Sequence, residues 1–249
     1  MRTLKFPREP APEFPKRFRG RPTRDPNRCP EDCRQCRARA PSAVLVPGPE
    51  RRTALDLGAC LFSPEEAAAC PAGAVSYTRD YRMAVAGREE LVTPTGEVAL
   101  ARALDERTRR LFGRSLRLRS VVAGSCGGCE AELVALGNVV FDLARFGVQF
   151  VASPRHADGL VVTGVVNVNM RLALEQTYEA VPAPKIVVAV GACALSGGPF
   201  RGSPEVGGGV GEQLPVDLWV PGCPPHPLTI LDGVLRLLGA IEQGDRPFQ

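Results

Sequence analysis

Aromatic residues are scarce in this chain: they make up 6% of its 249 residues, with one tryptophan and three tyrosines. Proteins that bind nucleic acid combine a basic surface with aromatic side chains on which bases stack. The net charge here is only +4, although basic residues gather near the start as Lys16, Arg17, Arg19, Arg21, Arg24 and Arg28. With so few aromatics beside them, these residues do not indicate nucleic acid as a partner.

Long apolar runs are missing as well. A membrane-spanning helix needs about 18 consecutive apolar residues, whereas the most apolar run, Ile186–Leu195, is short and contains Gly191 and Cys193. The first residues carry charge and proline throughout and lack the apolar core of an export signal. We therefore expect a cytoplasmic chain that does not cross a membrane. In that reducing compartment, clustered cysteines such as the nine found here indicate metal ligands in preference to disulfide bonds.

Composition divides the chain into four regions. Residues 1–26 form a basic, proline-rich extension, which is either a solvated tail or a segment that docks on a partner. Residues 27–92 carry five cysteines among short apolar segments, and residues 93–115 predict a linking helix from Glu97 to Phe112. Residues 116–249 alternate strand and helix patterns.

The last region predicts its elements most clearly. Strand patterns occupy 116–122, 148–152, 160–162, 185–190 and 217–220. Apolar residues at helical spacing occupy 133–143, a second helix capped by Asn167 runs to about 180, and a third starts at Pro227 and stops at Gly244. Strands that alternate with helices predict a parallel sheet covered on both faces, which is an α/β fold.

Four cysteines of this region follow predicted strands: Cys126, Cys129, Cys193 and Cys223. The loops after parallel strands meet at the carboxyl edge of a sheet. Four thiolates at one place suit a cubane iron–sulfur cluster or a zinc ion. The loop Gly124–Gly128 is rich in glycine, so its amides can turn toward cluster sulfides. The alternative is that these are buried structural cysteines.

Several segments carry a family resemblance, in the order GSCGGCEAEL, ARFGV, SPRHADGLVVTG, PAPKIVVAVGACALSGGPF and VPGCPPHP. Over roughly residues 116–240 the chain resembles the small subunit of energy-converting, formate-hydrogenlyase-type [NiFe] hydrogenases and the homologous cluster subunit of respiratory complex I. The resemblance implies a flavodoxin-like fold. It also implies one [4Fe–4S] cluster held by Cys126, Cys129, Cys193 and Cys223 beside a large catalytic subunit.

Details of the match separate the two branches of this family. Complex I subunits usually have adjacent cysteines at the first site, so the spacing of Cys126 and Cys129 favours the hydrogenase branch. The chain departs from the family at His226 and Leu228, where arginine and glutamate are common. Glu130 and Glu132 follow the cluster loop, and they either stabilise the positive start of the next helix or handle protons.

Residues 27–85 resemble a two-cluster ferredoxin that has lost ligands. The usual signature is C-x-x-C-x-x-C-x-x-x-C-P, in which the fourth cysteine serves the other cluster. One cluster would take Cys29, Cys33, Cys36 and Cys70, although Cys29 stands one residue earlier than expected. The other would need Ala40, Cys60, Ser63 and Glu66, which include a single thiol. We therefore predict a small α+β ferredoxin-like region with one [4Fe–4S] cluster or, alternatively, zinc, and with Cys60 as an ordinary buried thiol.

Together these resemblances imply an electron-transfer subunit without catalytic residues of its own. Its N-terminal cluster would exchange electrons with a donor, and its C-terminal cluster would exchange them with the catalytic site. The implied partners are a hydrogenase large subunit or the homologous large subunit of complex I, membrane subunits of the same complex, and a donor such as formate dehydrogenase or ferredoxin. The implied location is the cytoplasmic face of the inner membrane. A complex I-like quinone-reducing assembly and a non-redox zinc scaffold are the alternatives.

Overall fold

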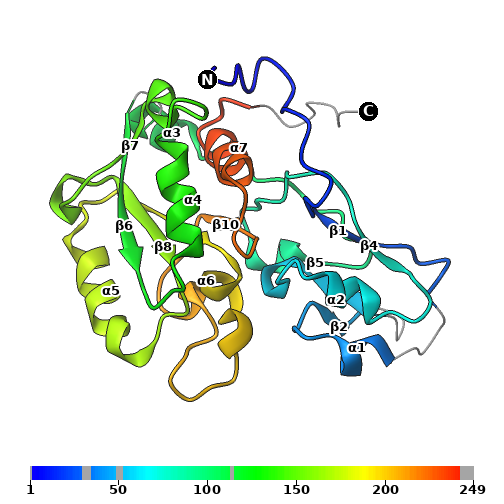
Figure 1. Ribbon diagram of the computed structural model, residues 1–249. Coiled ribbons are helices and arrows are strands. Elements are labelled where there is room, and N and C mark those ends of the chain that lie inside the picture. Colours follow the sequence, from blue (N-terminus) through cyan, green and yellow to red (C-terminus); the bar gives the residue numbers. More distant parts are fainter. Residues whose placement is uncertain (1, 30–34, 49–52, 113–114, 242–249) are drawn as a thin grey trace.

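The computed structural model describes residues 2–29, 35–48, 53–112 and 115–241. Two parts lie side by side in it, an α/β part with a parallel sheet and an N-terminal part with short strands and helices (Figure 1). No helix among the described residues combines the length and the apolar character that crossing a bilayer requires.

The α/β part is built on a five-stranded sheet in the order β10-β9-β8-β6-β7. Its strands are β6 (Leu116–Val122), β7 (Val148–Phe150), β8 (Gly159–Thr163), β9 (Ile186–Val190) and β10 (Leu218–Val220). Every neighbouring pair is parallel. Counted along the chain this is the order 2-1-3-4-5 of flavodoxin-like folds, so the α/β prediction is confirmed.

Helices cover both faces of this sheet, because the strands place alternate side chains in two cores. The helices are α4 (Gly128–Leu136), α5 (Val168–Ala180), α6 (Ala192–Ser196) and α7 (Pro227–Leu237). In β8, Val161 packs with residues of α4 and α7, whereas Leu160 and Val162 pack with residues of α5 and α6. Every residue of β8 and β9 is buried, as expected for central strands covered on both sides.

The N-terminal part consists of two small antiparallel sheets and short helices. Strands β1 (Pro22–Arg24) and β4 (Val75–Tyr77) form one sheet, and β2 (Leu45–Pro47), β3 (Thr53–Asp56) and β5 (Val92–Thr93) form the other. Its helices are α1 (Gln35–Arg39) and α2 (Pro64–Ala68), and its short 3-10 helices are η2 (Leu57–Ala59) and η3 (Arg88–Leu91). Helix α3 (Glu106–Phe112) lies beside the α/β part (Figure 1), where Phe112 joins the core that contains α4 and α7. The 3-10 helices of the α/β part are η4 (Leu143–Phe146), η5 (Pro154–His156), η6 (Gly198–Phe200) and η7 (Val210–Glu212).

The two parts share the apolar core that contains α5 and α6. Leu55 and Leu57 of the N-terminal part belong to the same buried cluster as Leu195 of α6. The backbone groups of Val85 and Trp219 exchange hydrogen bonds of 3.1 and 2.9 Å, which adds an antiparallel bridge at the edge strand β10. The N-terminal part therefore covers an edge and a face that the sheet would otherwise expose.

Three predicted helices are shorter than expected, and the last of them, α7, ends at Leu237 and not at Gly244, which lies outside the described residues. The linking helix starts at Glu106 instead of Glu97, since residues 97–105 run without helix. The helix after the first cysteine loop ends at Leu136, where Gly137 caps it, and does not reach Leu143. In each of these helices, the helix-forming residues or the apolar period extend further along the sequence than the helix itself, because packing ends the helix earlier.

The N-terminal extension packs against its own chain, which neither sequence alternative anticipated. Phe14 and Phe18 stack on each other at 4.1 Å, and both lie edge-on to His226. Burial lowers the pKa of His226 to about 4, and its Nδ1 caps α7 by accepting a bond from the Leu228 amide at 3.1 Å. The residue that departs from the family pattern is thus a neutral helix cap beneath the extension.

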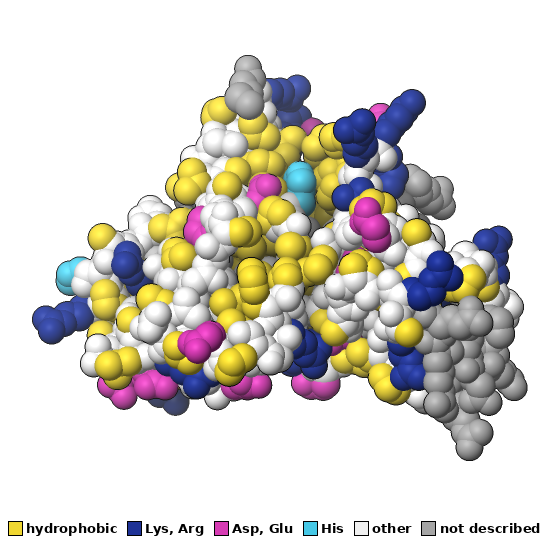
Figure 2. All heavy atoms as spheres, turned by 60° about the horizontal axis from the view of Figure 1, so that its bottom comes forward, with side chains coloured by type: hydrophobic (Ala, Val, Ile, Leu, Met, Phe, Trp, Pro, Cys, Tyr) yellow, Lys and Arg dark blue, Asp and Glu magenta, His cyan; other side chains and the backbone are white. Residues whose placement is uncertain are grey.

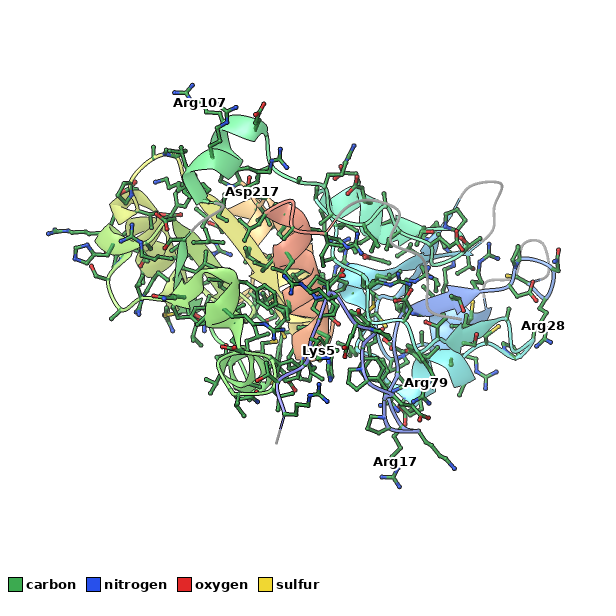
Figure 3. All side chains as sticks on the ribbon, turned by 90° about the horizontal axis from the view of Figure 1, so that it is seen from above. Lys5, Arg17, Arg28, Arg79, Arg107 and Asp217 are labelled. Carbon is green, nitrogen blue, oxygen red and sulfur yellow. The ribbon has the colours of Figure 1, made fainter. Side chains whose placement is uncertain are left out.

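Hydrogen bonds from Arg79 also hold the extension against the rest of the chain. Arg79 donates to the carbonyls of Phe14 and Pro15, and Figure 3 shows Arg79 and Arg17 near each other at the outer margin of the molecule. Arg17 is exposed, whereas Arg24 is buried and donates to Pro94 O at 2.7 Å, so the basic residues of the extension face both the solvent and the protein.

Phe14→Ala is expected to lower the free energy of unfolding by about 1–2 kcal/mol, because a half-buried ring that contacts three others is lost. Urea unfolding followed by circular dichroism measures this free energy of unfolding. Phe200→Ala is the matched control, since that ring is 59% exposed, and it should change stability by less than about 0.5 kcal/mol. Equal stability of both variants and the parent would contradict the packed extension.

Candidate metal centre

Three loops at the carboxyl edge of the parallel sheet meet around the four C-terminal cysteines. Cys126 and Cys129 follow β6, Cys193 follows β9, and Cys223 follows β10. The amide of Gly191 donates to Val220 O at 2.9 Å, and the amide of Ala192 donates to Gly222 O at 2.8 Å. These bonds hold the second and third loops together.

Glycines let the loops approach the sulfur atoms closely. A Cβ on Gly191 would collide with Cys129 Sγ, and one on Gly198 would lie 2.8 Å from Cys193 Sγ. A Cβ on Gly128 would lie 3.6 Å from Cys126 Sγ and 3.7 Å from Pro224. Only residues without a side chain fit beside two of these four thiols, which is the arrangement expected around a bulky sulfur-bound group.

The thiols also act on one another electrostatically. Burial raises the pKa of Cys129 to about 12, with Glu130 and the other three cysteines adding to the effect. Burial raises the pKa of Cys193 to about 11, followed by the charges of Cys223 and Cys126. The pKa of Cys223 is raised by burial, then by Cys126 and by Glu66. Burial and mutual repulsion therefore oppose ionisation of Cys129, Cys193 and Cys223, and a bound cation such as iron would offset that cost.

The donor set fits a cluster by its chemistry: four cysteine sulfurs on glycine-rich loops. Among the described residues, no three His, Cys, Asp or Glu side chains are arranged to hold a single metal ion. Cys126 and Cys223 are exposed, and Cys129 and Cys193 are partly buried. The site thus opens toward solvent on one side and is walled by the protein on the other.

The two glutamates after the first loop differ. Glu130 lies in the first turn of α4, where a negative charge stabilises the helix. It accepts hydrogen bonds from Ser125 at 2.8 Å and from the Thr163 hydroxyl. Glu132 lies beyond the first turn, and partial burial raises its pKa. Glu130 therefore links the cysteine loop to the end of β8, whereas no such link is seen for Glu132 among the described residues.

The N-terminal cysteines are only partly visible. Cys33 lies outside the described residues, and Cys29, Cys36 and Cys70 are all buried. The segments of Cys29 and Cys70 run side by side, because β1 pairs with β4 and the Asp25 amide donates to Ala74 O at 2.8 Å. Cys70 Sγ accepts a bond from the Ala74 amide at 3.3 Å, of the kind that amides make to cluster sulfurs.

A hydrogen-bond network surrounds Glu66 and Cys60, two of the residues at the predicted second ferredoxin-like site. Glu66, 1% exposed, accepts bonds from Tyr77 Oη at 2.6 Å, from the Ser63 amide at 3.0 Å and from Cys60 Sγ at 3.3 Å. Cys60 is buried as predicted, but it is not an ordinary apolar thiol, because it donates to a carboxylate. The capping box S-x-x-E at Ser63–Glu66 was the sequence signal for this inward-turned glutamate.

Figure 2 looks toward the carboxyl edge of the sheet, and hydrophobic side chains gather there in a band across the middle of the face. Large apolar side chains are exposed on elements next to the cysteine loops. Val134 of α4 is 77% exposed and Phe200, after the Cys193 loop, is 59% exposed. Apolar patches of this kind mark protein contact surfaces.

Known proteins share this half of the chain. The family described as NADH ubiquinone oxidoreductase, 20 Kd subunit, matches residues 126–237. A Pyrococcus furiosus protein named probable membrane-bound hydrogenase subunit mbhJ is 45% identical over 129 residues, which are 52% of this chain and 77% of that protein. This chain belongs to the NADH ubiquinone oxidoreductase 20 Kd subunit family.

Other members of this family carry names from both branches. Formate hydrogenlyase subunit 7 of Escherichia coli is 44% identical over 130 residues, or 52% of this chain and 51% of that protein. An NADH-quinone oxidoreductase subunit of Heliobacterium modesticaldum is 45% identical over 115 residues, or 46% and 66%. The chain thus spans about half the length of the formate hydrogenlyase subunit. The matched family region includes Cys126, Cys129, Cys193 and Cys223.

Proposed function

We propose that this chain is an iron–sulfur electron-transfer subunit of a membrane-associated energy-converting hydrogenase or formate hydrogenlyase complex. The observation that carries the proposal is the meeting of four thiols from three strand-end loops at one sheet edge. The relatives named as hydrogenase and formate hydrogenlyase subunits support the same assignment.

In this proposal Cys126, Cys129, Cys193 and Cys223 hold one [4Fe–4S] cluster. The cluster carries single electrons, and the protein sets its potential through burial, charge and hydrogen bonds to sulfur. Gly191 and Gly198 leave room at the sulfurs, and Glu130 braces the first loop.

A second [4Fe–4S] cluster is proposed in the N-terminal region, on Cys29, Cys33, Cys36 and Cys70. It would exchange electrons with a donor protein such as ferredoxin or formate dehydrogenase. The C-terminal cluster would exchange them with the catalytic site of a large subunit, docked over the apolar band of Figure 2. The complex would sit on the cytoplasmic face of the inner membrane through its membrane subunits.

Affinity purification of the full chain from its native host, without oxygen, tests this function. We expect a brown preparation that bleaches on reduction, together with a large subunit that carries two C-x-x-C motifs and hydrogenase activity. A colourless chain that binds zinc would instead support the non-redox scaffold and refute the proposal.

The second candidate is a subunit of a complex I-like, quinone-reducing assembly. It is favoured by the NADH-quinone oxidoreductase relatives, which match as closely as the hydrogenase relatives do. Against it stands the spacing of Cys126 and Cys129, since complex I subunits usually have adjacent cysteines there. A copurified large subunit without C-x-x-C motifs would decide for this candidate.

A further inference from the structure

The position where a ferredoxin would hold its second cluster contains a buried carboxylate. Within the described residues five neutral donors converge on Glu66: the Leu61 and Ser63 amides, Cys60 Sγ, Tyr77 Oη and Ser42 Oγ. A carboxylate only accepts hydrogen bonds, whereas a carboxylic acid must also donate one. The Tyr77 hydroxyl is shared with Ser63 O at 3.0 Å, but each oxygen of Glu66 also receives a backbone amide, which can only donate, so the surroundings match the ionised form.

The protein builds this site at a conformational cost. Phe62, between Cys60 and Ser63, has a left-handed backbone with φ of 56°, which a bulky residue adopts only under constraint. Its amide donates to Cys60 Sγ at 3.3 Å, and its carbonyl accepts a bond from Arg19. The turn is thus fixed from both sides in the shape that directs the Leu61 and Ser63 amides at Glu66.

The Glu66 site lies against the C-terminal thiol site. The 3-10 helix η2, which leads into Cys60, packs on α6, which carries Cys193. Arg88 joins the same two elements, since it donates to Leu195 O of α6 at 3.2 Å and to Asp56, the cap of η2, at 2.8 Å. The charge of Glu66 also contributes to raising the pKa of Cys223.

We propose that Glu66 is a potential-setting residue, whose fixed negative charge disfavours reduction of the cluster at Cys126, Cys129, Cys193 and Cys223. This inference rests on the proposed function. Reduction adds one electron to a cluster, so an anion held nearby in a poorly screened interior opposes it. In this view the position of the missing second ferredoxin cluster holds a negative charge, and this charge lowers the potential of the C-terminal cluster.

Glu66→Gln tests the proposal, because it removes the charge and keeps the shape. Potentiometric titration of the anaerobically reconstituted full chain, followed by electron paramagnetic resonance, gives each cluster's midpoint. Unit charges about 10 Å apart at an effective dielectric constant near 20 change an equilibrium constant by about tenfold. The midpoint is therefore expected to rise by about 59 mV for a one-electron couple. The shift is expected in the electron paramagnetic resonance signal of the C-terminal cluster, which is the signal that Cys193→Ser should abolish.

Two further variants separate charge from packing. Glu66→Asp keeps the charge and should keep the midpoint close to that of the parent, whereas Glu65→Gln removes an exposed carboxylate one residue away and should leave it unchanged. Glu66→Met is a second neutral variant and should raise the midpoint as Glu66→Gln does. Failure of both neutral variants to bind iron would mark Glu66 as a packing residue and overturn the proposal.

The remaining outcomes distinguish this inference from the proposed function. If the parent chain binds no iron, the proposed function fails. If parent and Glu66→Gln bind equal iron and titrate at the same potential, the function stands and the role of Glu66 is refuted. A midpoint raised equally by Glu66→Gln and Glu66→Asp would show a structural effect and likewise refute it.

Discussion

Cys193→Ser is expected to lose about 4 irons per chain, because a [4Fe–4S] cluster needs thiolate ligands and a neutral serine hydroxyl replaces one poorly. The parent should contain about 8 irons, as two cubanes, against about 12 if a third cluster were present. Iron and acid-labile sulfide analysis of anaerobically reconstituted protein measures these totals. The Cys193 sulfur lies against Gly198, where a Cβ would be only 2.8 Å from it.

Two other cysteine variants make this experiment discriminating. Cys70→Ser should also lose about 4 irons, from the N-terminal site, whereas Cys60→Ser should keep the full content. Cys60 is buried, but its thiol is engaged with Glu66. If Cys60→Ser removes a cluster and Cys70→Ser does not, the proposed assignment of ligands between the two ferredoxin-like sites is wrong.

Gly191→Ala should abolish the C-terminal cluster although it changes no ligand. The residue has φ of 90° and ψ of 154°, a region essentially restricted to glycine, so a side chain there costs about 1–3 kcal/mol. Its new methyl group would also collide with Cys129 Sγ, and forcing an extra carbon into a packed site costs about 1–3 kcal/mol more. The loop or the sulfur must move, so we expect a loss of about 4 irons.

Gly127→Ala is the control for a positive-φ glycine of the cysteine loops without a close neighbour. Its backbone is left-handed, with φ of 86° and ψ of −11°, which side chains tolerate better than the conformation of Gly191, and a Cβ there meets nothing within 4 Å. It should cost about 1–2 kcal/mol of stability and keep its iron. Iron analysis and urea unfolding of both variants provide the comparison. Full iron in Gly191→Ala would mean that the close contact with Cys129 is absent in the loaded protein.

Much of the α/β part could be predicted from sequence because its signals are local. β6 matches its predicted bounds, and Asn167 caps α5 as expected, with its side chain accepting from the Met170 amide at 3.1 Å. The short helix α6 was not predicted. Its five residues include Cys193 and follow β9 directly, which is too short a stretch for an apolar period to show.

The extension and Glu66 show where local patterns stop being informative. Nothing within residues 1–26 marks Phe14 as the neighbour of Tyr81 and His226, which lie far along the chain. Glu66 likewise takes donors from Ser42 and Tyr77, and its capping box alone indicates a helix start. Both arrangements depend on contacts between distant segments, which a window of neighbouring residues does not contain.

By itself, then, the sequence determined the parallel α/β architecture and the candidate ligands, since strand periods, loop glycines and cysteine spacing are properties of neighbouring residues. Tertiary structure alone decided what surrounds those ligands. It placed a helix-capping His226 under the extension, and a buried Glu66 next to Cys60, in the segment that packs on the Cys193 helix. The reason is physical: burial, hydrogen bonding and charge act through space, so they are set only when distant segments pack together.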